Sequence, residues 1–223
     1  MQNSVKPKNT STNKKLVAHG CSFTYGCELE DPSKSAFPIL VGNKLGYDVD
    51  NLAIPGTSNE HIIKDVVNYK DPIDLLLVCW TCETRFELGN YKGDVEKFGW
   101  NLVKPVMNKT LNKVLTTEYL NWEFFIDKMY HQHVMLQTYC EYNNIPYVFC
   151  YSVQNRATQQ KHKNTDTHVK SLINWNKWYN PTESFRTLTI NNFEYSWDEH
   201  PLEEGHAFFA ENLYNFIISD IIN

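Results

Sequence analysis

Residues 74–80 of the chain read DLLLVCW, a short and almost wholly apolar run. A strand that is covered on both faces of its sheet needs apolar side chains on both sides, so this run predicts a buried strand of a parallel sheet. Other short apolar or alternating runs predict three further strands, at residues 15–19, 47–53 and 147–151.

Longer stretches with helical spacing separate these runs, at residues 35–45, 57–69, 118–143 and 201–222. Thr57, Ser58 and Asn59 offer N-cap side chains to the second of them, and Pro201 suits the first turn of the last. Strands that alternate with helices form right-handed βαβ units. The sequence therefore predicts an α/β fold, with helices on both faces of a parallel sheet and ligands bound beyond the carboxyl ends of its strands.

The composition excludes several classes of protein. The chain has 223 residues, of which 42% are hydrophobic, with a net charge of −5 and a mean hydropathy of −0.49. This apolar content excludes a disordered chain, and no run approaches the roughly 20 apolar residues of a membrane-spanning helix. The acidic charge does not fit a general nucleic-acid binder. We therefore expect no nucleic-acid partner and no membrane span.

Residues 1–14 are polar and basic, without the apolar segment of a secretory signal. We interpret them as a flexible tail ahead of a single domain at residues 15–223, with a basic arm for an acidic partner as the alternative. Six cysteines without a dense spacing pattern indicate reduced thiols and a cytoplasmic protein, although export within a larger particle would leave the same pattern. Cys79 and Cys82 form an isolated CxxC without the second ligand pair of a zinc site.

A serine follows the first predicted strand, at a tight turn that reads His19-Gly20-Cys21-Ser22. Such a turn can present the Ser22 hydroxyl at the edge of the sheet, while the Ser22 N–H faces a developing oxyanion. After the second strand, Gly56 leaves room for a substrate and offers a second N–H donor. Each segment taken alone also fits an ordinary turn and helix cap.

Near the end of the chain, Asp198 stands two residues before His200. A carboxylate in this position can hold Nδ1–H of the imidazole, which leaves Nε2 free to take a proton from a serine. His200 alone also fits a surface residue at the start of a helix. Because all three segments lie at the same predicted edge of the sheet, together they favour a site that joins the Ser22 hydroxyl, the His200 imidazole and the Asp198 carboxylate much more strongly than any one segment does alone.

These segments resemble the conserved blocks of the SGNH/GDSL hydrolases. HGCSFTYG at 19–26, NLAIPGTSN at 51–59 and DEHPLEEGH at 198–206 are similar to the first, second and fifth blocks, and the resemblance runs from Lys15 to Leu213. It implies a three-layer α/β/α esterase with a Ser-His-Asp triad, with Ser22 and Gly56 N–H groups as oxyanion donors, and with no metal or cofactor. It also implies small acyl groups, such as acetyl esters on carbohydrate, so that the partner is a small ester or an acylated glycan.

The chain departs from this family in the third block, where the family has an Asn as third oxyanion donor. Residues 80–87 read WTCETRFE, without an Asn. Thr81 Oγ or the Arg85 guanidinium can take its place, and losing one such donor costs about 10²–10³ in rate. Cys21 also replaces the family's Asp before the serine, and Asp198 stands two rather than three residues before His200.

These departures leave a second hypothesis open. The chain would then be a weak or inactive member that binds glycans as a subunit of a larger assembly. The extra segment 86–117, which we interpret as an insertion or a lid, also motivates this reading. A third hypothesis, a flavodoxin-like nucleotide binder, lacks a glycine-rich phosphate-binding loop.

The remaining histidines and aromatic residues have simpler explanations. His131 and His133 lie on a predicted long helix, where contact with the core fits better than metal ligation. His162 and His168 fall in a polar loop, and His206 lies within the last helix, where it is poorly placed to replace His200 as base. The aromatic residues at 175–179 and Trp100 can stack on sugars but fit a core or a lid better.

Overall fold

The computed structural model describes residues 14–89, 95–98, 121–153 and 168–222. Its centre is a parallel sheet in the order β2-β1-β3-β6. All four strands predicted from the sequence are present, as β1 (Lys15–Gly20), β2 (Asp48–Asn51), β3 (Leu75–Trp80) and β6 (Tyr147–Tyr151). Every residue of β3 is buried, as a strand covered on both faces requires.

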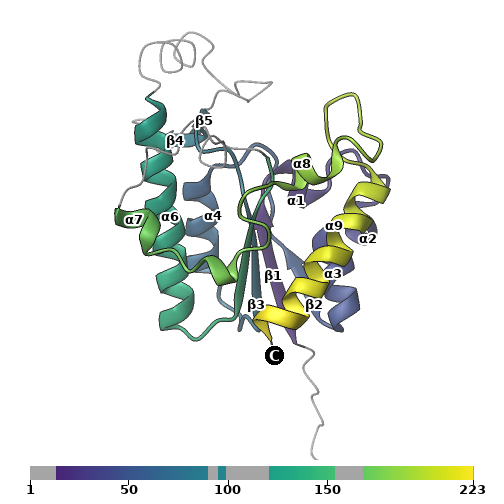
Figure 1. The fold of residues 1–223 in the computed structure, drawn as a ribbon, viewed down its shortest axis with the longest axis horizontal. Helices are drawn as coiled ribbons and strands as arrows, with labels where there is room; N and C mark the ends of the chain where they lie inside the picture. Colours follow the sequence, from purple (N-terminus) through teal and green to yellow (C-terminus); the bar gives the residue numbers. More distant parts are fainter. Residues whose placement is uncertain (1–13, 90–94, 99–120, 154–167, 223) are drawn as a thin grey trace, which may run out of the picture.

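Helices cover both faces of this sheet (Figure 1). On one face lie α4 (Asn59–Asn68) and α6 (Trp122–Tyr142), and on the other α3 (Phe37–Leu45) and α9 (Glu203–Phe216). Alternate residues of β1, β3 and β6 enter separate apolar clusters, because successive side chains of a strand point to opposite faces. Leu77 packs with the α3 and α9 side, whereas Val78 packs with the α4 and α6 side. The predicted α/β/α architecture is confirmed.

Three predicted helices begin at different residues from those expected. The helix expected at 118–143 begins at Trp122, because its N-cap, Asn121, has an extended backbone. The helix expected at 35–45 is divided into α2 (Pro32–Ser35) and α3, because Ala36 between them has an extended backbone. The last helix begins at Glu203 rather than at Pro201, because Pro201 pairs with Tyr195 in an antiparallel bridge. A π-helical turn, η4 (Ile217–Ile221), extends α9.

Several elements of three to five residues are too short to show a period in the sequence. They are α1 (Ser22–Tyr25), α7 (His168–Ser171), η3 (Trp175–Lys177) and α8 (Phe185–Thr189). No helix in the described ranges combines the length and the apolar character that crossing a membrane requires.

Most of the segment 86–117, expected as an insertion or a lid, lies outside the described residues. Its described parts are β4 (Phe86–Gly89) and β5 (Val95–Phe98), which pair antiparallel in a separate two-stranded sheet. Strand β4 packs against α4. Residues 1–13, Trp100 and His162 also lie outside the described ranges.

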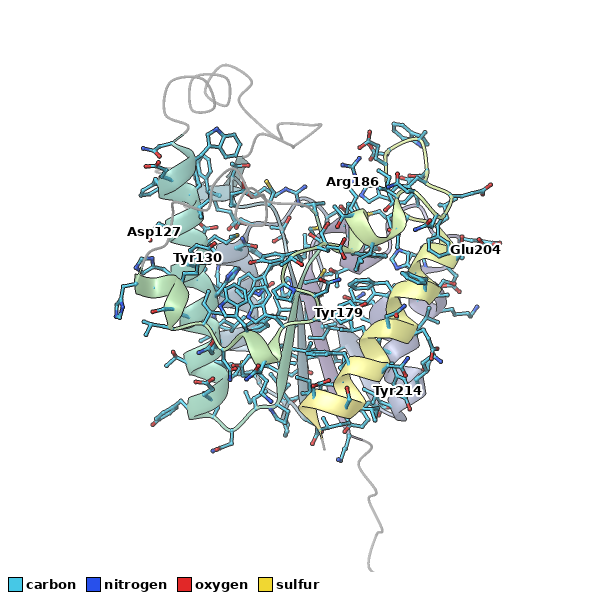
Figure 2. All side chains as sticks on the ribbon, viewed as in Figure 1. Asp127, Tyr130, Tyr179, Arg186, Glu204 and Tyr214 are labelled. Atoms are coloured by element: carbon cyan, nitrogen blue, oxygen red, sulfur yellow. The ribbon has the colours of Figure 1, made fainter. Side chains whose placement is uncertain are left out.

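The aromatic residues at 175–179 and His133 belong to the core. Trp178 is 2% exposed, and Tyr179 lies between the sheet and α9 (Figure 2), where its ring packs 5.5 Å from that of Phe209. The His133 ring on α6 is fully buried beside the rings of Trp80 and Trp178, at 4.5 and 4.6 Å between centroids. Of the core or lid role expected for the aromatic residues, the structure shows the core role, with Trp178 fully buried and Trp175 and Tyr179 partly buried against the two apolar clusters.

His206 connects α9 to α3. Its ring is buried, and Nδ1 accepts a hydrogen bond from the backbone N–H of Phe37 at 3.1 Å. The sequence left His206 as a second candidate base. In the structure its ring contributes to the packing of the two helices.

Acid is expected to destabilise the protein through these two buried histidines. Burial lowers the pKa of His133 well below its ordinary value and that of His206 to about 3, whereas the unfolded chain protonates both near pH 6.5. The free energy of unfolding should therefore fall below pH 6.5, by about 1.4 kcal/mol per pH unit for each group. Urea denaturation between pH 6.5 and 5 measures this slope. His206→Asn, which keeps an acceptor for Phe37, should make the slope shallower, and an unchanged slope would contradict the assignment.

Candidate active site

Ser22 lies at the sharp turn between β1 and α1. Cys21 has an extended backbone, α1 begins at Ser22, and Gly26 ends it in the left-handed region with φ 86°. Gly20 is needed because a Cβ at this position would lie 2.1 Å from Thr24 Oγ1 and 2.8 Å from the Cys79 carbonyl oxygen. The turn places Ser22 at the carboxyl edge of the sheet, where it keeps 9% of its surface exposed.

The loop after β2 runs beside this turn. The N–H of Ile54 donates to the Gly20 carbonyl at 3.1 Å, and Asn51 Nδ2 donates to the Thr24 carbonyl at 3.0 Å. Gly56 in this loop has φ 73°, which favours glycine. Within the described ranges, the N–H groups of Ser22 and Gly56 have no acceptor. Both predicted oxyanion donors are therefore free at the same edge of the sheet.

His200 reaches this edge on a turn between α8 and α9. The N–H of Ser196 donates to the His200 carbonyl at 2.8 Å, and the His200 N–H donates back to Ser196 Oγ at 3.1 Å. Glu199 within the turn has φ 58°, and its carboxylate pairs with Arg186 at 2.5 Å. These contacts fix the turn that carries the imidazole.

The imidazole of His200 packs against the residue next to Ser22. The ring centroids of His200 and Phe23 lie 5.1 Å apart, so the turn before α9 packs on α1 here. His200 Nδ1 faces Asp198 Oδ2 at 3.9 Å and is buried without a hydrogen bond. No hydrogen bond joins Ser22 to His200 among the described residues. Catalytic hydrogen bonds are often long before a substrate binds.

The electrostatic surroundings keep His200 neutral at pH 7. Burial lowers the pKa of His200 below its ordinary value, against the opposing effect of the carboxylates of Asp198 and Glu28. The Arg85 guanidinium lowers this pKa further. A neutral imidazole is the form that can accept a proton from a serine.

Arg85 lies on the segment that follows β3, in which the sequence has no Asn. The residue is 8% exposed, and its Nη1 donates to Thr81 Oγ1 at 2.8 Å. Its Nε is buried and has no acceptor within the described ranges. Burial opposes ionisation of the Cys21 thiol, but the Arg85 charge and a hydrogen bond with Ser152 bring the pKa of Cys21 below its ordinary value. The guanidinium therefore acts on both residues that flank the site, Cys21 and His200.

Thr81 is engaged in other contacts. It is fully buried, its Oγ1 accepts from Arg85, and its N–H donates to Asn59 Oδ1 at 3.0 Å. Of the two candidate replacements for the missing Asn, Arg85 is thus the one with a buried N–H left unpaired.

Two residues that support the site were not predicted from the sequence. Asn59 binds the backbone of Thr81, and Ser152 accepts from the Cys21 thiol at 3.3 Å while it donates to the Trp80 carbonyl at 2.9 Å. Ser152 directly follows a predicted strand, so the rule that identified Ser22 could have found it. For Asn59, the sequence alone predicts only a role as a helix cap.

His131 and His168 lie at the surface of the described structure. His131 is exposed and hydrogen-bonds its own helix at the Asp127 carbonyl, and His168 lies on the exposed start of α7. The described part of the chain holds no group of three or more His, Cys, Asp or Glu side chains arranged for a metal ion.

No protein-family model matches the sequence, and no curated protein is significantly similar to it. Solved structures do resemble it. The esterase EstA from Pseudoalteromonas sp. matches at a TM-score of 0.55 and 11% identity, over 92% of this chain and 97% of that chain. A lipolytic protein of the G-D-S-L family from Veillonella parvula matches at 0.50 and 13%, over 92% and 99%. A family two carbohydrate esterase from Clostridium thermocellum matches at 0.53 and 15%, over 97% and 66%.

Proposed function

We propose that this chain, which has the fold of the SGNH/GDSL hydrolases, is a serine esterase that cleaves carboxylic esters with small acyl groups. The observation that carries the proposal is the contact between the His200 ring and Phe23. It brings an imidazole from the end of the chain beside the turn that presents a hydroxyl near its start.

In the proposed reaction, Ser22 Oγ bonds to the acyl carbonyl carbon while His200 Nε2 takes the hydroxyl proton. The tetrahedral intermediate then expels the alcohol, which receives that proton from the imidazolium. Water, deprotonated by His200, attacks the acyl-enzyme. The second tetrahedral intermediate then releases the acid, and the imidazolium returns the proton to Ser22 Oγ. Asp198 stabilises the imidazolium, in agreement with its effect of raising the pKa of His200.

The oxyanion that forms in both steps needs hydrogen-bond donors fixed in advance. We assign this role to the N–H groups of Ser22 and Gly56 and to Nε–H of Arg85, three donors without acceptors among the described residues. Thr81 supports Arg85 by accepting from its Nη1. No step requires a metal or a cofactor.

Hydrolysis of p-nitrophenyl acetate by the purified full chain tests this proposal. We expect turnover that declines with butyrate and longer acyl esters and that is abolished in Ser22→Ala. Absence of turnover on acetyl esters by the wild type, or equal turnover in Ser22→Ala, would contradict the proposal.

One observation favours a second function, a glycan-binding subunit without turnover. His200 has no hydrogen bond with Ser22 or Asp198 in the described structure. Such a binder would retain affinity for an acetylated xylo-oligosaccharide, measured by calorimetry, with equal affinity in the wild type and in Ser22→Ala and with no release of acetate from either.

The exposed side chain of Trp197 indicates a carbohydrate ester as substrate. Trp197 is 86% exposed and directly precedes Asp198. An indole of this kind suits stacking on the C–H face of a sugar ring. The carbohydrate esterase from Clostridium thermocellum was solved in complex with cellohexaose.

Replacing Trp197 with alanine should therefore raise KM for an acetylated xylo-oligosaccharide by about 3- to 10-fold, the effect of losing one aromatic stacking contact. Hydrolysis of p-nitrophenyl acetate, which has no sugar to stack, should keep its kcat/KM. The matched control is Tyr142→Ala, because Tyr142 is 85% exposed but lies at the far end of α6. Equal losses on both substrates, or no change on either, would contradict a sugar-binding role.

A further inference from the structure

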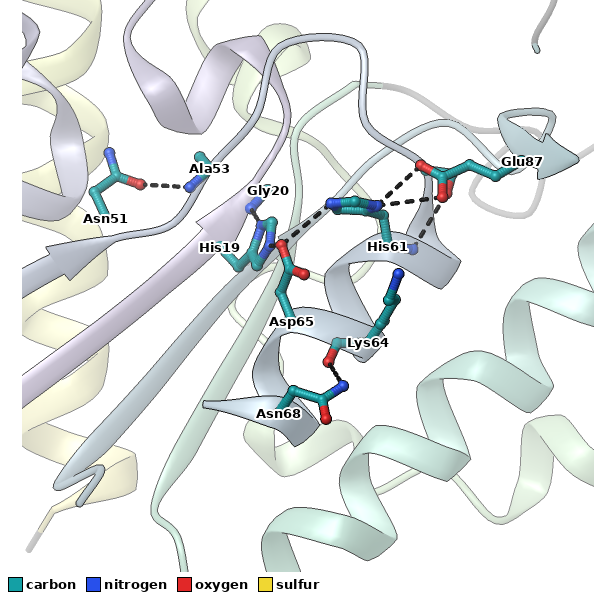
Figure 3. A network of polar contacts seen from close by, with 10 residues as sticks. His19, Gly20, Asn51, Ala53, His61, Lys64, Asp65, Asn68 and Glu87 are labelled. Carbon is teal, nitrogen blue, oxygen red and sulfur yellow. Dashed lines mark hydrogen bonds and ion pairs between the residues drawn. The ribbon is translucent and has the colours of Figure 1, made fainter. Parts of the chain in front are cut away.

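Four titratable side chains form a connected network beside the site, on the α4 face of the sheet (Figure 3). Asp65 Oδ2 lies 3.0 Å from Nε2 of His19 and 3.3 Å from Nε2 of His61. The other ring nitrogen of His61, Nδ1, faces the Glu87 carboxylate at 3.1 and 3.2 Å from its two oxygens. The network thus connects β1, α4 and β4.

The two histidines of this network need different numbers of protons. His19 Nδ1 accepts from the Gly20 N–H at 2.8 Å, so a neutral ring carries its proton on Nε2 and donates it to Asp65. His61 has a carboxylate at each ring nitrogen, and an ionised carboxylate only accepts hydrogen bonds. Only the doubly protonated ring can satisfy both contacts. A neutral His61 would place a lone pair against Asp65 or Glu87.

The position of His61 connects this network to the segment that carries Arg85. Glu87 stands two residues after Arg85, at the start of β4. Asn59, two residues before His61 on the first turn of α4, holds the other end of the same segment by accepting from the Thr81 N–H at 3.0 Å. The first turn of α4 therefore binds the segment from Thr81 to Glu87 at both ends, with Arg85 between the two anchors.

We infer that His61 and Glu87 are positioning residues, which hold Arg85 at the oxyanion site through the contact between the His61 ring and the Glu87 carboxylate. The inference rests on the proposed role of Arg85. Without this contact the Glu87 anchor is lost while the Asn59 anchor remains, and the Arg85 guanidinium loses its fixed position. Misplacing a catalytic group by about 1 Å costs up to 10²-fold in rate.

Other charged groups near His61 are accounted for by their own partners. Glu60, its neighbour on α4, forms an ion pair with Lys128 of α6. Lys128 also lies over the ring of Phe86, 5.8 Å from its centroid. On β1, the described charged or titratable group that faces His61 is His19, and on β4 it is Glu87. Asp65 and Glu87 thus remain as the anionic partners of the His61 ring.

A double-mutant cycle between His61→Ala and Arg85→Met tests the inference. We expect His61→Ala alone to lower kcat on p-nitrophenyl acetate by about 10- to 100-fold with little change in KM. In the Arg85→Met background the same change should have no further effect, because its action passes through Arg85. Losses that multiply, or an unchanged kcat in His61→Ala, would overturn the inference.

Rescue by a conservative variant supplies a second readout that a merely structural role would not change. Glu87→Ala removes the partner of His61 Nδ1 and should lower kcat by about 10- to 100-fold with little change in KM. Glu87→Gln keeps an amide oxygen that can accept from the ring and should recover most of this loss. Equal losses in the two variants would overturn the inference.

Hydrogen exchange separates this inference from the proposed function. In the Ser22→Ala background, His61→Ala should speed amide exchange in the Thr81–Glu87 segment, with the exposed His131→Ala as control. Unchanged exchange would overturn the inference even where Ser22 proves to be the nucleophile. Full activity in Ser22→Ala would instead overturn the proposed function while the faster exchange persists.

Discussion

Ser22→Ala is expected to lower kcat for acetyl-ester hydrolysis by at least about 10⁴-fold, the size of loss seen when a triad serine is removed. The reason is that the side chain supplies the only atom that forms a covalent bond with the acyl group. The fold and stability should be retained, because the Ser22 side chain forms no hydrogen bond among the described residues. Steady-state hydrolysis of p-nitrophenyl acetate with active-site titration measures the effect.

The matched control for this change is Ser171→Ala. Ser171 is an exposed serine on α7 whose hydroxyl bonds the His168 carbonyl of its own turn. This variant should hydrolyse the ester at the wild-type rate. Comparable activity in Ser22→Ala and the wild type would exclude Ser22 as nucleophile.

Arg85→Met should have the second largest effect, a loss of about 10²–10³ in kcat with KM nearly unchanged, because an oxyanion donor acts mainly in the transition state. The pH below which kcat/KM falls should also change. Since the Arg85 charge lowers the pKa of His200, its removal raises that pKa and shifts the acid fall to higher pH. A profile of kcat/KM between pH 4.5 and 9 reports both changes.

Thr81→Val provides the comparison that separates the two candidate donors. It removes the hydroxyl that accepts from Arg85 Nη1 but leaves the guanidinium charge and its free Nε in place. We expect a smaller loss of kcat than in Arg85→Met and no change in the pH at which kcat/KM falls on the acid side. A full loss in Thr81→Val with an active Arg85→Met would assign the third donor to Thr81 instead.

The sheet could be predicted from the sequence because each of its strands has a clear apolar or alternating run. The run at 147–151 coincides with β6, and the run at 74–80 contains β3. The β4–β5 hairpin could not be predicted. Its four-residue strands, FELG and VEKF, carry charged residues and are too short to show a period.

Part of the candidate site could be predicted from the sequence for the same reason. Ser22 and Gly56 follow predicted strands, and parallel strands bring such positions to one edge. His200 could be added only through its spacing from Asp198 and the family resemblance. The supporting contacts could not be predicted, because the contact of His61 with Glu87 joins residues 26 positions apart and depends on how β4 packs on α4. Neither residue has a local pattern that would show this pairing.

The nucleophile itself is tested most directly by locating a covalent phosphonate. The full chain is treated with a fluorophosphonate, digested, and sequenced by mass spectrometry. The account predicts one stoichiometric adduct, on Ser22 within the peptide that contains Cys21 and Phe23, and none after Ser22→Ala. An adduct on any other residue, or the same labelling in the variant, would contradict it.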